Sequence, residues 1–295
     1  MVETGNGFRT KDYGPEPETE STVTEKASKK GNSEGDVAFI EGEYIDEVYD
    51  DGGVTVFDEE SNPYGEINMG YQIRFMGWPN KAFGLISGKW TYKDEKGVVN
   101  TVPIVASGVL ISKAVVLTAA HCIYSRKYKK EGSSFKFFPA MDGITIPYGE
   151  AEIDEVRYPK EFKEDFGSMN PYGYHKYDYA LCFLKKPIGS KTGYVSLEFE
   201  RKDYENVQLK MTGYSSEIAV DVDARYQWET DVHQLKLKED DINIKGVSDK
   251  IYYKTRTRKG NSGAGIWHEE NGKVRLAGIH CRKLARSDHP KFSYN

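Results

Sequence analysis

Three residues that lie far apart in the sequence have the side-chain types of a nucleophilic catalytic site. Ser262 lies between glycines in "GNSG", His121 ends the run "VVLTAAH", and Asp178 begins the run "DYALCFL". His121 precedes Asp178 by 57 residues, and Ser262 follows Asp178 by 84 residues. A serine hydroxyl needs a base to become nucleophilic at neutral pH, and an imidazole base needs an acid that fixes its tautomer. We therefore take these residues as candidate nucleophile, base and orienting acid.

Each of these residues, taken singly, also has a simpler structural explanation. A serine between glycines is common in turns, a lone histidine is usually structural, and an acid before a strand often caps it. The glycines around Ser262 favour the catalytic interpretation, because Gly260 and Gly263 let the backbone turn sharply. The main-chain amides of Gly260 and Ser262 could then stabilise the oxyanion that develops during acyl transfer.

Short β-rich runs that alternate with glycine, lysine and asparagine predict an all-β protein built as a sandwich or a pair of barrels. Aromatic residues make up 13% of the 295-residue chain, which favours strands over long helices. We expect irregular loops at 125–140 and 158–177. Strands are expected at 82–92, 101–111, 114–120, 179–186, 206–214, 223–237, 250–255, 263–269 and 273–280.

The segments "ASGVLISKAVVLTAAHC", "DYAL" and "GNSGAG" resemble the three active-site blocks of the chymotrypsin-like, trypsin-fold serine proteases. The segments "TGY", "YQWE" and "GIH" resemble, more narrowly, the glutamyl endopeptidase branch. The resemblance implies two antiparallel six-stranded β-barrels with the active site between them. It also implies that Ser262 is the nucleophile, His121 the general base and Asp178 its orienting acid, acting on protein or peptide substrates without a cofactor or metal.

The resemblance also indicates which residues would line the pocket for the substrate residue before the scissile bond. Thr257 and His280 match positions that contact the substrate carboxylate in glutamyl endopeptidases. Arg256 occupies the position at which trypsins carry the aspartate that binds basic substrates. We therefore expect Arg256, Thr257 and His280 to bind substrate, with a preference for Glu or Asp before the scissile bond.

The chain divides by charge into an N-terminal extension, residues 1–65, and a protease domain, residues 66–295. Residues 1–65 carry a net charge of −12, whereas the remainder carries +7. We expect the acidic extension to be largely disordered and to act as an inhibitory propeptide over the basic body. Residue 261 is Asn where trypsins have the Asp that pairs with the freed N-terminus, so activation should differ from that of trypsin. Our hypothesis is cleavage after Glu66, which would release Ile67 as the mature terminus.

One alternative is a catalytically silent, protease-like module that binds acidic protein segments. The intact Ser, His and Asp argue against it, whereas the charged "HCRK" after residue 279 argues for it. The resemblance leads one to expect a further strand and helix after Asn295, so the domain would be C-terminally truncated.

Composition excludes several other classes of function. The body lacks the aromatic and basic motifs of a nucleic-acid module, and its longest apolar stretch, 105–120, is too interrupted to span a membrane. Three widely spaced cysteines predict mostly buried thiols and at most one disulfide. We expect a monomer. The resemblance implies a secreted protein, although no signal peptide is visible at the N-terminus.

Overall fold

The computed structural model describes residues 71–72, 77–164, 173–199, 204, 206–215, 226–234, 251, 253–255, 257 and 260–281. The N-terminal extension expected at 1–65 lies outside these residues. Nearly all regular structure in the described part of the chain is β, with a single short α-helix, α1 (Gly189–Thr192), and several 3-10 helices. The predicted all-β fold class is therefore confirmed.

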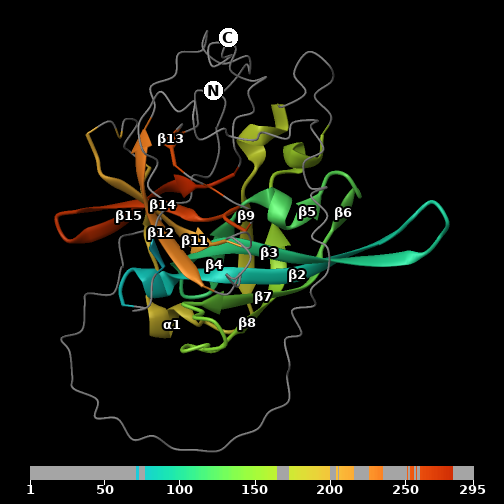
Figure 1. Ribbon diagram of the computed structural model, residues 1–295, viewed down its shortest axis with the longest axis horizontal. Helices are drawn as coiled ribbons and strands as arrows, with labels where there is room; N and C mark the ends of the chain where they lie inside the picture. The colour runs from blue at the N-terminus through green and yellow to red at the C-terminus, as the bar shows by residue number, and fades with distance from the viewer. Residues whose placement is uncertain are drawn as a thin grey trace, which may run out of the picture.

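Six antiparallel strands close into a barrel in the order β2-β3-β4-β9-β8-β7. Alternate side chains of a strand point to opposite faces, so in β9 the side chains of Ala180, Cys182 and Leu184 enter the core while those between them are partly exposed. The β2–β3 hairpin extends well beyond the barrel, at the right of Figure 1. The strands are β2 (Phe83–Lys93), β3 (Val99–Ser112), β4 (Val115–Thr118), β7 (Ser133–Pro139), β8 (Ala151–Arg157) and β9 (Ala180–Leu184).

The C-terminal half forms a second sheet of seven strands, drawn mainly in orange and red in Figure 1. Its order is β1-β12-β11-β14-β15-β10, and β13 pairs with the far end of β12. The two predicted barrels thus correspond to one closed six-stranded barrel and one seven-stranded sheet in the described residues. The strands are β1 (Tyr71–Gln72), β10 (Ser196–Leu197), β11 (Leu209–Tyr214), β12 (Gln227–Gln234), β13 (Tyr253–Lys254), β14 (Gly265–Glu270) and β15 (Lys273–Ile279).

The barrel and the second sheet pack against each other through buried side chains. The ring centroids of Phe83 in β2 and Trp267 in β14 lie 6.1 Å apart. The buried side-chain amide of Gln227 in β12 donates hydrogen bonds to the carbonyls of Asn80 and Phe83, at 3.0 and 3.1 Å. These contacts fix the relative position of the two halves, on which any site between them depends.

The expectation of an irregular loop at 125–140 is wrong. The segment forms the end of β5 (Tyr124–Ser125), then β6 (Lys130–Glu131) and β7, which pairs with both β2 and β8. Phe135 and Phe137 alternate inward along β7, so the aromatic side chains of this segment complete the barrel core. The segment 158–177 contains the 3-10 helices η5 (Lys160–Lys163) and η6 (Gly173–Tyr177), and residues 165–172 lie outside the described part.

Candidate active site

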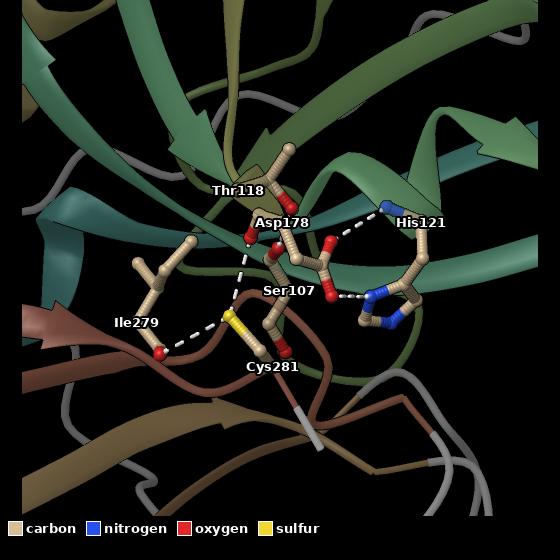
Figure 2. A network of polar contacts seen from close by, with 6 residues as sticks. All are labelled: Ser107, Thr118, His121, Asp178, Ile279 and Cys281. Carbon is tan, nitrogen blue, oxygen red and sulfur yellow. Dashed lines mark hydrogen bonds and ion pairs between the residues drawn. The ribbon is translucent and has the colours of Figure 1, made fainter. Parts of the chain in front are cut away.

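His121 and Asp178 come together because the strands β4 and β9 that adjoin them are paired. The register of these strands places Thr118 opposite Ala180. The 3-10 helix η4 (Ala120–Cys122), which carries His121, then follows β4, while Asp178 directly precedes β9. His121 Nδ1 lies 2.7 Å from Asp178 Oδ2, and the His121 main-chain amide donates to Oδ1 at 2.9 Å (Figure 2). One carboxylate oxygen therefore orients the imidazole, while the other is bonded to the main chain of the same residue.

This buried pair changes the proton affinity of the imidazole. Burial alone would lower the pKa of His121, because it removes water from the charged ring. The Asp178 carboxylate and the neighbouring Cys122 outweigh this effect and hold the pKa of His121 well above its usual value of 6.5. An imidazole paired in this way accepts a proton readily, which is what a general base requires.

The turn that carries Ser262 is fastened to both halves of the molecule through its main chain. The Ser262 carbonyl accepts a hydrogen bond from the amide of Ser107, in β3, at 2.8 Å. The next amide, of Gly263, donates to the carbonyl of His280 at 2.7 Å. The turn therefore lies against β3 on one side and against the end of β15 on the other.

Gly263 brings this turn close to the segment that leads to His121. Its φ is +81°, and a Cβ placed there would lie 2.2 Å from both the Ser107 carbonyl and Thr118 Oγ1, and 3.2 Å from the Ala119 amide. Thr118 Oγ1 itself donates to the Ser107 carbonyl at 2.7 Å. The turn after Ser262 thus packs directly on the backbone two residues before His121.

We expect Gly263→Ala to destabilise the fold by about 3 kcal/mol or more, because the strained φ and the clash with main-chain atoms add together. Gly272→Ala is the matched control. Gly272 also has a positive φ, +71°, but a Cβ at this position would meet no atom within 4 Å, so its cost should be about 1 kcal/mol. Urea unfolding of both variants measures the difference, and equal costs would contradict the close packing at Gly263.

The residues before Ser262 are held by buried polar contacts. Gly260 has a φ of +87°, and its carbonyl accepts a 2.7 Å hydrogen bond from the hydroxyl of Ser107. The side-chain amide of Asn261 donates to the Tyr214 carbonyl at 3.0 Å. These bonds fix the conformation of the peptide units of Gly260 and Asn261, and a preorganised backbone is what an oxyanion hole requires.

The structure describes two of the three predicted substrate-binding residues. Thr257 and His280 are both buried, at 5% and 7% exposure, and Arg256 lies outside the described residues. The main chain of His280 contacts the Ser262 turn, because its amide donates to the Ala264 carbonyl at 2.8 Å. Its ring nitrogen Nδ1 lies 2.6 Å from the hydroxyl of Tyr253.

Sequence reasoning missed three residues of this region. Ser107 bridges the Gly260 carbonyl and the Tyr214 amide through one hydroxyl. The thiol of the partly exposed Cys281 donates to the Asp178 carbonyl at 3.2 Å (Figure 2). Tyr253 was expected only as part of a strand. The position of Ser107 inside the "ASGVLI" block was the one available signal, since none of the partners is close in sequence.

The described part of the chain has neither a metal cluster nor a membrane-spanning helix. Within the described residues, no three side chains of His, Cys, Asp or Glu lie close enough together to bind one metal ion. Its helices are all too short or too polar to cross a membrane.

A closed six-stranded β-barrel packed against a second sheet, with a buried His121–Asp178 pair at one end of β4 and β9, is the architecture of a trypsin-like fold. A family model described as "Trypsin" matches residues 86–292, so the chain belongs to the trypsin family. It is also similar to the glutamyl endopeptidase of Bacillus licheniformis, with 24% identity over 174 residues. That match covers 58% of this chain and 48% of the relative, so the chain spans about half the length of the curated relative it matches.

Solved structures show the same fold at low sequence identity. A Glu endopeptidase in complex with MPD has a TM-score of 0.54 and 20% identity, covering 74% of this chain and 86% of that one. The protease Anisep from Arthrobacter nicotinovorans has a TM-score of 0.51 and 16% identity, covering 72% and 87%. These similarities support the predicted trypsin-like fold.

Proposed function

We propose that this protein is a serine endopeptidase in which Ser262 is the nucleophile, His121 the general base and Asp178 the residue that orients it. The observation that carries the proposal is the buried His121–Asp178 pair, with 2.7 and 2.9 Å contacts to the two carboxylate oxygens. Membership of the trypsin family supports the same assignment. The packing of the Ser262 turn on the backbone before His121 supports the placement of the serine next to this base.

The reaction balances with these residues alone. Ser262 Oγ attacks the carbonyl carbon of the scissile peptide bond while its proton passes to Nε2 of His121. The main-chain amides of Gly260 and Ser262 stabilise the resulting oxyanion. The carbon–nitrogen bond then breaks, and the leaving amine takes the proton from His121. Water, deprotonated by the same imidazole, finally hydrolyses the acyl-enzyme and restores the serine hydroxyl.

The proposed substrates are proteins or peptides with Glu, or secondarily Asp, before the scissile bond. His280 and Thr257 are buried polar residues, the main chain of His280 is bonded to the Ser262 turn, and Arg256 would add positive charge. A carboxylate that receives charge-assisted or well-aligned hydrogen bonds in a buried site is bound selectively over a neutral group. The resemblance to a glutamyl endopeptidase supports this choice.

A panel of peptides that differ only before the scissile bond tests this function on the full chain and on a version that begins at Ile67. We expect kcat/KM for Glu to exceed that for the isosteric Gln by about 10²-fold, because Gln fills the same space without the charge. Arg, Phe and Ala should be cleaved more slowly still. Equal rates for Glu and Gln, or a preference for Arg, would refute the specificity, and binding of acidic peptides without cleavage would favour a silent module.

The same peptide panel tests whether the acidic extension inhibits the enzyme. Residues 1–65, with a net charge of −12, would cover the basic cleft until cleavage after Glu66 exposes Ile67. Active material should therefore begin at Ile67, and the inhibition of the full chain should weaken as salt is added. Full activity in a monomer that still begins at Met1 is the result that excludes an inhibitory role.

A further inference from the structure

His280, a residue of the proposed substrate pocket, makes a partly buried side-chain hydrogen bond that no catalytic step uses. The hydroxyl of Tyr253 lies 2.6 Å from His280 Nδ1. Tyr253 is in the short strand β13 and pairs with Gln234 of β12, whereas His280 directly follows β15. Two separate parts of the second sheet therefore bring their side chains together at this point.

The direction of this hydrogen bond follows from the partners of the phenol. Within the described residues, His280 Nδ1 is the hydrogen-bond partner that the structure gives the Tyr253 hydroxyl. A buried hydroxyl proton that points at no acceptor costs free energy, so the proton must lie between the two atoms with oxygen as donor. Burial, with a smaller effect of Cys281, also holds the pKa of Tyr253 well above its usual value, so the phenol keeps its proton.

An acceptor at Nδ1 determines the state of the other ring nitrogen. A neutral imidazole carries one proton, so His280 has its proton on Nε2 when Nδ1 accepts. Nδ1 is directed at Tyr253, which packs against the core of the second sheet with Ile251. Nε2, on the other side of the ring, therefore carries the proton and is a hydrogen-bond donor.

The main chain of His280 is bonded to the turn that carries the proposed nucleophile. Its amide donates to the Ala264 carbonyl at 2.8 Å, and its carbonyl accepts from the Gly263 amide at 2.7 Å. The histidine is thus fixed on both sides to the turn that carries Ser262. The hydrogen bond from the Tyr253 hydroxyl to Nδ1 then opposes rotation of the ring.

We propose that Tyr253 is a specificity-determining residue that positions His280, by holding it in the tautomer that presents Nε2–H to the carboxylate of the substrate. This inference rests on the proposed function, since it names the group that makes the pocket selective for an acidic side chain. A phenylalanine would fill the same volume, so the hydroxyl is the part of Tyr253 that the role requires. Tyr253 touches neither substrate nor the reacting atoms and acts through His280.

The first test is the tautomer itself, measured by ¹⁵N NMR of the histidine rings in the full chain, with His280 assigned by substitution. We expect Nε2 to be protonated and Nδ1 unprotonated in the wild type. In Tyr253→Phe, loss of the donor should give a mixture of tautomers or ring orientations. A wild-type ring protonated on Nδ1 would overturn the inference, whether or not the protein cleaves peptides.

The second test is selectivity. Tyr253→Phe should lower the ratio of kcat/KM for Glu over Gln about tenfold, while the rate for Gln stays within about twofold, because the Gln substrate depends less on this donor. In a His280→Ala background the same substitution should change nothing further. An unchanged ratio in an otherwise Glu-selective enzyme would overturn the positioning role.

Tyr158→Phe provides the matched control. Tyr158 is a partly buried phenol of the first barrel whose hydroxyl donates to Glu131 at 2.9 Å, so the variant also loses one tyrosine hydrogen bond. Its Glu-to-Gln ratio should equal that of the wild type. A wild type without Glu selectivity would instead refute the proposed specificity, and the NMR result would then show separately whether Tyr253 holds the His280 tautomer.

Discussion

Replacement of Ser262 by alanine should lower kcat for the best peptide substrate by a factor on the order of 10⁶. Without the hydroxyl no acyl-enzyme can form, and His121 and Asp178 have no nucleophile to activate. The loss should appear in kcat, since the pocket residues Thr257 and His280 are untouched. The residual rate would come from substrate binding and from the oxyanion-stabilising amides.

The structure predicts that this substitution leaves the fold intact. Ser262 is only partly buried, and its hydrogen bond to the barrel runs through its main-chain carbonyl, which accepts from the Ser107 amide at 2.8 Å. Alanine keeps that carbonyl and the same backbone conformation. The midpoint of thermal unfolding should therefore stay within a few degrees of the wild type.

Kinetics and covalent labelling together check the role of Ser262. An electrophilic phosphonyl fluoride should add one phosphonyl group to the wild type, at Ser262, and none to Ser262→Ala. Ser190→Ala, an exposed serine in α1, should behave as the wild type in both assays. Retention of more than about 1% of kcat by Ser262→Ala, or labelling of another residue, would show that the nucleophile has been misassigned.

The strands were predictable wherever local pattern and turn residues agree. The runs at 82–92, 179–186 and 273–280 match β2, β9 and β15 within a few residues, because apolar and aromatic residues dominate there and glycine or lysine interrupts or bounds each run. The prediction of an irregular loop at 125–140 was wrong because the first half of the segment is rich in lysine, which favours a loop. The alternation of Phe135 and Phe137, which decides its structure, is too short to dominate a local reading.

The partners within the site could not be predicted, because they depend on register and on contacts between the two halves. Ser107 meets Gly260 across 153 residues, and Tyr253 meets His280 across 27 residues and two strands. Residue types and order suggested His121, Asp178 and Ser262 as a unit. Only the pairing of β4 with β9 shows how one carboxylate oxygen of Asp178 meets the imidazole and the other meets the His121 main-chain amide.

Replacement of Asp178 by asparagine should lower kcat near neutral pH by about 10⁴-fold. Asparagine can still accept from the His121 main-chain amide through its oxygen, as Oδ1 does now at 2.9 Å. Its NH₂ group would then face Nδ1, which would have to become an acceptor. The ring proton would move to Nε2, the atom that must take the proton from Ser262, so the base would be blocked in the wrong tautomer.

The same substitution should change the pH dependence of activity and of stability. In the wild type the raised pKa of His121 means that kcat/KM increases with pH through a value above 6.5, as the base loses its proton. The pair stabilises the fold fully below about pH 6.5, the unfolded value, and this contribution is lost as pH rises through the higher folded pKa. In Asp178→Asn burial is opposed only by Cys122, so the pKa of His121 should fall and this stabilisation should be largely lost.

Rate profiles and urea unfolding between about pH 5 and pH 10 measure both effects on the full chain. Asp154→Asn, which removes an exposed carboxylate from β8, controls for the change in net charge and should leave both profiles unchanged. If Asp178→Asn kept the wild-type rate and the same pH midpoint, Asp178 would be a strand cap with no catalytic role. If it lost activity but retained the raised midpoint, the charge that raises the pKa of His121 would have to come from Cys122, the other group that raises it.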